Sequence, residues 1–172
     1  MTPLALLRGT AVLLAMCAVG AGPVLAKSPK GKIFEDWAVE CEQPAGAKDE
    51  KCFVTQSAVM NKEGAPPQRL MKFSVGYLGP KGEVVAVGLL PLGISIPTGV
   101  AFKIDDLPQR AMQLQSCGPE GCVATALLDA DTVKAMQHGK TMVVGALPQG
   151  GNQTLNLPVS LKGFKAALAS LD

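Results

Sequence analysis

The chain has 172 residues, a length typical of one domain, and hydrophobic residues make up 48% of it. Charged residues make up only 17%, which excludes an intrinsically disordered chain, because disorder needs low hydrophobicity and high net charge. Sixteen Lys and Arg against fourteen Asp and Glu give a formal net charge of +2. That balance is too even for a nucleic-acid-binding domain, which needs clustered basic residues.

Residues 1–26 have the three-part layout of a secretory signal peptide. Arg8 supplies positive charge, residues 10–19 form an apolar run, and Val24-Leu25-Ala26 offers small residues for cleavage. The run is too short to span a ~30 Å hydrocarbon layer, which takes about 20 residues. We therefore expect cleavage after Ala26, with Ala21 as the second choice, and no stable membrane span afterwards.

Cys17 lies inside the apolar run and invites comparison with a lipid-attachment box. Met16 stands where such a box has a small residue, so we interpret Cys17 as a hydrophobic residue of the signal. Residues 27–172 are then predicted to form a single domain, since the sequence contains no internal repeat or low-complexity segment.

The body of the chain predicts short strands separated by Gly- and Pro-containing turns. Apolar and polar residues alternate over 71–77, 112–115 and 154–159, which predicts strands with one buried face. The more continuously apolar runs 84–90 and 142–147 predict central strands covered on both faces. Residues 94–96 and 100–104 predict a hairpin closed by Pro97-Thr98-Gly99. Turns recur about every ten residues, which is typical of a sandwich or barrel.

Two segments have helical periodicity instead. Asp131 is predicted to cap a short helix near 131–138, with Val133 and Met136 facing inward and Gly139 ending it. Ser160 is predicted to cap a C-terminal helix over 161–171. Its apolar stripe, which we expect to dock on the sheet, consists of Leu161, Phe164, Leu168 and Leu171. The predicted fold is mainly β, an antiparallel β-sandwich with these two helices.

Four cysteines remain after the predicted signal, and an even number in an exported chain is typical of disulfides. Of the three pairings, we favour the local ones, Cys41–Cys52 and Cys117–Cys122, because polar loop and turn sequences separate their members. Neither spacing is the C-x₂-C of a zinc or thiol-redox site. The first disulfide is expected to stabilise the fold more, because it closes the longer loop.

No catalytic motif stands out. His138 is the sole histidine of the sequence, and its expected role is local, at the end of the short helix. The nucleophile motif G-x-S-x-G is absent. The neighbouring acids Glu35-Asp36 and Asp105-Asp106 do not make the facing pair that a glycosidase needs. We expect no metal and no cofactor, and core packing for most aromatic residues, with Trp37 the one to inspect.

Several motifs, spread over roughly residues 33–171, occur together in this order: Trp37-Ala-Val-Glu-Cys41 with Cys52, Pro91-Leu-Gly-Ile-Ser-Ile-Pro-Thr-Gly99, Val100-Ala-Phe-Lys-Ile-Asp105, Cys117, Gly121-Cys122-Val-Ala124, the 136–139 region and Val159-Ser-Leu-Lys-Gly-Phe-Lys-Ala-Ala-Leu168. Together they resemble the invasion-associated locus B family of exported bacterial proteins. The resemblance implies a small, mostly β protein of the periplasm or cell surface. The family supplies no agreed catalytic residues.

Two classes of function follow. We expect a non-enzymatic protein, periplasmic, outer-membrane-associated or secreted, that binds an envelope or host macromolecule through a sheet face, an edge strand or loops. Its candidate binding loop contains Lys48, Asp49, Glu50 and Lys51. The alternative is an envelope hydrolase or thiol-redox enzyme whose site is assembled only in the fold. A polar pocket that joins His138 to a serine or carboxylate would favour that alternative.

Overall fold

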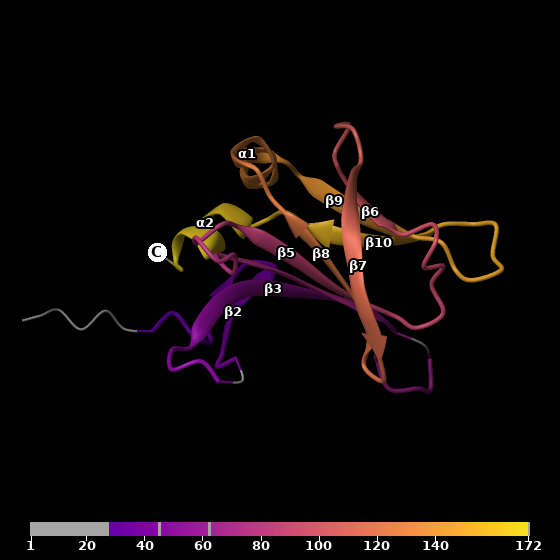
Figure 1. Cartoon of the computed structure of the whole chain (residues 1–172), viewed down its shortest axis with the longest axis horizontal. Coiled ribbons are helices and arrows are strands. Elements are labelled where there is room, and N and C mark those ends of the chain that lie inside the picture. Colours follow the sequence, from indigo (N-terminus) through magenta and orange to yellow (C-terminus); the bar gives the residue numbers. More distant parts are fainter. Residues whose placement is uncertain (1–27, 45, 62, 172) are drawn as a thin grey trace, which may run out of the picture.

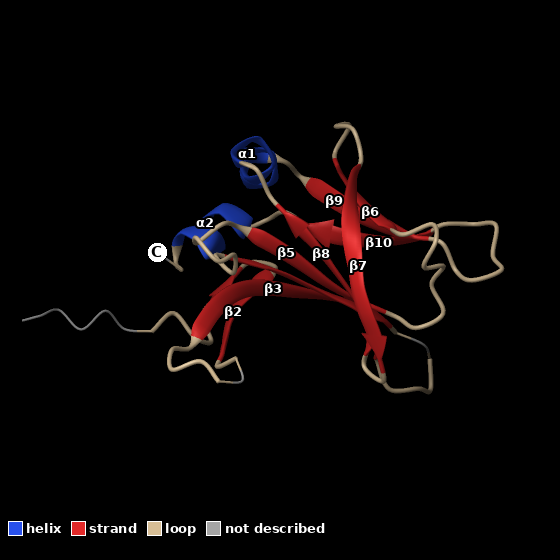
Figure 2. Ribbon diagram, in the orientation of Figure 1, coloured by secondary structure: helices blue, strands red, loops and turns tan. Residues whose placement is uncertain are grey.

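The structure is a computed structural model that describes residues 28–44, 46–61 and 63–171; the predicted signal peptide, with Cys17, lies outside this range. The described chain is mainly antiparallel β with two short helices, as predicted (Figure 2). In chain order the elements are β1 (Ile33–Phe34), β2 (Trp37–Glu42), β3 (Lys51–Met60), β4 (Gln68–Gly76), β5 (Val85–Leu90), β6 (Val100–Ile104), β7 (Arg110–Gly118), β8 (Gly121–Leu127), α1 (Ala130–His138), β9 (Thr141–Ala146), β10 (Leu155–Ser160) and α2 (Phe164–Ala169).

The strands form one continuous antiparallel ladder in the order β1-β2-β3-β4-β5-β8-β7-β6-β9-β10. β7 joins its two halves, because residues 113–118 pair with β8 whereas residues 110–112 pair with β6. The ladder curls at this strand, so that β6, β9 and β10 form a second layer (Figure 1). β10 then packs against β3 and β4 of the first layer. The result is the expected sandwich-like fold.

Side chains, rather than a strand pair, close the curled sheet between β3 and β10. The Nε2 of Gln56 donates to the backbone oxygen of Ser160 at 3.3 Å, and the Ser160 amide donates to the Oε1 of Gln56 at 2.8 Å. The Nε1 of Trp37 donates to the same Ser160 oxygen at 2.9 Å. The Gln56 carboxamide therefore pairs with β10 as a peptide group of a neighbouring strand would.

The core lies between the two layers and continues under α2. Trp37 is fully buried, and its ring lies 5.0 Å from that of Phe164 on α2. On β4, Met71, Phe73 and Val75 are buried, which agrees with the predicted inward face. Buried apolar area is the main stabilising term of a fold of this size. Trp37 is thus a core residue and offers no exposed binding platform.

Both helices lie where periodicity predicts, but their predicted caps are wrong. Asp129, not Asp131, caps α1, because its Oδ1 accepts from the Thr132 amide at 2.8 Å. α2 covers 164–169 rather than 161–171, and Gly163 precedes it with a φ of 81° and no side-chain cap. Ser160 is occupied in the seam with Gln56 and belongs to β10. The apolar stripe of α2 does dock, against β1, β2 and β3.

Two strand predictions also need correction. Residues 94–96 do not pair with 100–104; Ile94 bridges to Pro148 instead, and the Ser95 amide donates to the oxygen of Leu147 at 2.7 Å. Residues 94–95 therefore lie beside residues 147–148, which directly follow β9. β5 and β9 are central in the ladder, but residues along them alternate between buried and partly exposed. They are fully covered on one face only, because none of the described residues forms a further layer on the outside.

Candidate functional site

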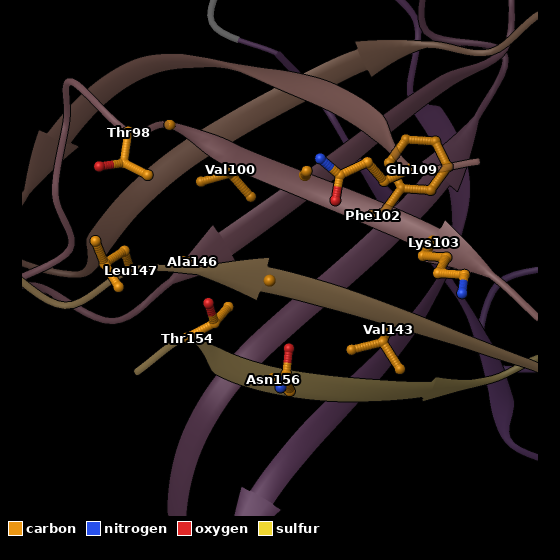
Figure 3. A pocket seen from close by; sticks show the side chains of 13 residues that line it. Thr98, Val100, Phe102, Lys103, Gln109, Val143, Ala146, Leu147, Thr154 and Asn156 are labelled. Atoms are coloured by element: carbon orange, nitrogen blue, oxygen red, sulfur yellow. The ribbon is translucent and has the colours of Figure 1, made fainter. Parts of the chain in front are cut away.

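An open trough of about 720 Å³ lies on the outer face of β6, β9 and β10 (Figure 3). Its floor is explained by the strand register, since Ala101 of β6 is directly opposite Gly145 of β9, and Gly145 is directly opposite Asn156 of β10. Gly145 has no side chain and Ala101 has only a methyl group, so no side chain rises above the sheet at these two positions. The trough therefore forms because the pairing of the three strands places these residues side by side.

The rims of the trough are mostly polar. Lys103 and Gln109 lie at the β6 side, whereas Thr154 and Asn156 lie at the β10 side (Figure 3). Val143 of β9 adds an apolar surface between them. The described lining residues thus offer amides, hydroxyls and one ammonium group, but no carboxylate. Such a surface can hydrogen-bond to an extended ligand, and it contains no acid and base placed for proton transfer.

His138 does not line this trough. Its Nδ1 lies 2.8 Å from the backbone oxygen of Lys134, one turn back on α1, and because a carbonyl only accepts, the ring donates there. The side chain is exposed beside a second open hollow, which is mostly apolar but is also lined by the carboxylates of Glu83 and Asp129. Within the described residues, no serine or carboxylate hydrogen-bonds to the ring. His138 therefore sits at the end of α1, where we expected it.

The predicted binding loop lies elsewhere on the molecule. Lys48, Asp49 and Glu50 belong to the β2–β3 connection, which is at the opposite end of the view from β6, β9 and β10 (Figure 1). All three are exposed, as is Lys51 at the start of β3. The loop is held by an ion pair between Lys30 Nζ and Glu50 Oε1 at 2.5 Å. The loop and the trough thus cannot form one site.

The structure brings together both expected cysteine pairs. The Sγ atoms are 2.08 Å apart in Cys41–Cys52 and 2.03 Å apart in Cys117–Cys122. Each pair consists of directly opposite residues of a hairpin, β2–β3 in the first case and β7–β8 in the second. Glu50 lies near the first pair in a cluster of potential metal ligands. The two sulfurs are bonded to each other, so neither is a thiolate that could bind a metal, and we interpret the pair as a structural disulfide.

The carboxylates with shifted pKa values stabilise the two ends of α1. Hydrogen bonds from the Thr132 hydroxyl and amide, together with the Arg110 guanidinium, lower the pKa of Asp129 to about 2. The backbone amides of Thr141 and Lys140 lower the pKa of Asp105. Both carboxylates accept several hydrogen bonds from the protein, so their role is structural. Glu35, of the other sequence-adjacent acid pair, lies in the β1–β2 turn with a φ of 53°.

Sequence reasoning missed the trough residues. Ala101, Gly145 and Asn156 are unremarkable in the sequence, and they meet only because β6 pairs with β9 and β9 with β10. The sole signal was Gly145 inside the apolar run 142–147, since a glycine within a strand often marks the close approach of another group.

No helix among the described residues is long and apolar enough to cross a membrane.

The family model for invasion associated locus B (IalB) protein matches residues 37–172. An invasion protein B homolog of Brucella abortus is 31% identical over 137 residues, covering 78% of this chain and 75% of the homolog. Invasion protein B of Bartonella bacilliformis is 27% identical over 157 residues, covering 87% and 81%. The crystal structure of invasion associated protein B from Bartonella henselae superposes with a TM-score of 0.68 at 25% identity, covering 81% of this chain and 94% of that one.

Proposed function

Since this chain belongs to the invasion associated locus B family, we propose that it is an exported, non-enzymatic protein that binds an envelope or host-surface macromolecule. One observation carries the proposal. The trough on β6, β9 and β10 is open, and it combines an apolar floor with neutral hydrogen-bonding side chains and a single ammonium group at its rims. An extended segment of a polymer fits such a surface better than a small substrate, which needs an enclosing cavity.

Two observations support export to the periplasm, the outer membrane or the medium. Residues 1–26 have the pattern of a signal peptide, and cleavage after Ala26 remains our expectation. Both cysteine pairs are within bonding distance, and disulfides persist in oxidising compartments. Intact-mass measurement of the protein recovered from the envelope fraction tests this. A mass that corresponds to residues 27–172 with two disulfides is expected, and the full-length mass would contradict it.

The non-enzymatic part of the proposal is supported by the surroundings of His138. His138 is exposed, does not line the trough, and among the described residues no serine or carboxylate hydrogen-bonds to its ring. The Nδ1–H donated to the backbone oxygen of Lys134 orients the ring, but a general base also needs a substrate within reach of its other nitrogen, and the trough does not bring one there. We therefore expect His138→Ala to leave envelope binding unchanged, whereas loss of the cellular phenotype in a folded His138→Ala protein would favour an enzyme.

Co-sedimentation with isolated bacterial envelopes tests the binding site. Ala101→Arg places a long cation over the floor of the trough, and because Ala101 faces outward, the fold should be retained. We expect the amount bound to fall at least about ten-fold, the equivalent of 1.4 kcal/mol. Ala166→Arg is the matched control. Ala166 is exposed on α2, so this substitution makes the same change in charge and size at a place away from the trough.

A second variant examines the β2–β3 loop, which sequence reasoning favoured. It reverses all four charges with Lys48→Glu, Asp49→Lys, Glu50→Lys and Lys51→Glu, so the net charge is unchanged. If the trough is the binding site, this variant binds as well as the wild type. Binding that survives Ala101→Arg but is lost on charge reversal would contradict the trough and assign recognition to the loop.

A further inference from the structure

The two ends of the strand order are protected against pairing with another chain. At one end, β1 has only two residues. At the other end, Ser160 of β10 directs its backbone groups to the Gln56 side chain, away from β9. Backbone direction alternates along a strand, so Pro158 also faces the open side of β10. It has no N–H to donate there, and proline is a common guard of edge strands.

The C-terminal half of β7, residues 113–118, has no such protection. Residues 113–118 pair with β8 on one side, but β6 pairs only with residues 110–112 on the other. The structure gives the 114–118 edge no backbone partner on the β6 side among the residues it describes. Gln115, at the irregularity in the β7–β8 register, turns its Nε2 to Thr125 on β8 and leaves this edge clear. The edge is also exposed, with Leu114 the one partly buried residue of 113–118.

We propose that a second copy of this chain occupies this edge by antiparallel pairing of β7 with β7 across a two-fold axis near Ser116. A two-fold axis at Ser116 places Ser116 opposite its own copy, Gln115 opposite Cys117 and Leu114 opposite Gly118, an arrangement that is tolerated only where the strand carries no like charges. The edge meets this condition, since Gln113, Leu114, Gln115, Ser116, Cys117 and Gly118 are all neutral. It contains neither the lysine nor the proline that blocks association of edge strands.

The pairing would join two β7–β8 hairpins into a four-stranded ribbon. Such an interface is small, so we expect a reversible dimer with a dissociation constant in the micromolar range. The proposal does not depend on the trough, which lies on β6, β9 and β10. It predicts that both troughs of a dimer remain open.

Sedimentation equilibrium of the protein, in the form that the cell produces and over ~1–300 µM, tests the proposal. Ser116→Lys and Ser116→Glu each place two like charges opposite each other across the axis. Each should weaken the dimer at least ten-fold, and an equimolar mixture of the two variants should restore it. Gln153→Lys, an exposed change in the β9–β10 loop, is the control and should leave the dimer unaffected.

Hydrogen exchange at low and high concentration provides the second measurement. The proposal requires added protection confined to the β7 peptide that contains residues 113–118. A monomer at 300 µM would overturn it. So would a dimer that Ser116→Lys leaves intact, because another surface, or the N-terminal segment of the chain, would then hold the copies together.

Discussion

The two helices are anchored in contrasting ways. α1 begins at a hydrogen-bonded polar cluster, in which Asp129 accepts from Thr132 and Arg110. α2 begins at Gly163, which lacks a side chain, and is held by the burial of Phe164 against Trp37. Charge and hydrogen bonds thus position one helix, whereas shape and apolar burial position the other. The first should respond to pH, and the second to changes in side-chain volume.

Phe164→Ala should have the largest effect. Phe164 is fully buried and packs on Trp37, so its removal leaves a cavity between α2 and the sheet. Truncation of a buried phenylalanine costs about 3–5 kcal/mol. Denaturant unfolding should show this loss, with little change for Lys165→Ala, the exposed neighbour on the same helix. A loss below about 1 kcal/mol would mean that burial does not anchor α2.

Gly163→Ala should come next. Its φ of 81° is unfavourable for alanine, and an added Cβ would lie 2.1 Å from the backbone oxygen of Phe34. Gly150→Ala is the control, because Gly150 has a φ of 72° with nothing within 4 Å of the added Cβ. The control measures the backbone penalty alone, about 1–2 kcal/mol. Gly163→Ala should exceed it, and equal losses for the two variants would show that the turn before β2 moves aside freely.

Asp129→Asn should have the smallest effect, and that effect should depend on pH. The pKa of Asp129 is about 2 in the folded chain against an ordinary value of 3.8. The unfolded chain therefore binds more protons in this window, so the stabilisation is complete above about pH 5 and is lost as pH falls toward 2. Asparagine keeps the cap acceptor but removes the charge. Thermal unfolding should show the wild type more stable at pH 6, with the difference shrinking toward pH 2; a pH-independent difference would contradict this.

Sequence patterns located elements better than their ends or partners. Periodicity placed α1 but not its cap, because Asp129 and Asp131 are equally good cap residues and only the Thr132 and Arg110 contacts distinguish them. The 94–104 segment has the local pattern of a hairpin, yet Ile94 pairs with Pro148, just after β9, instead. Predicting the trough would have required the register of three strands, β6, β9 and β10. Each of these outcomes depends on residues far apart in the chain, which local patterns do not contain.

The Gln56–Ser160 seam has a consequence for how the chain folds. Its partners are 104 residues apart in sequence, so the contact closes a very long loop. Long-range contacts of this kind carry a large entropic cost before they contribute stability, and they slow folding. The Trp37 indole N–H also lacks its acceptor, the Ser160 oxygen, until β10 has been synthesised. The N-terminal half of the core therefore stays incomplete until that last strand is available. A chain that completes its core from its C-terminal end stays unfolded while it is still being made, which would suit the export proposed above.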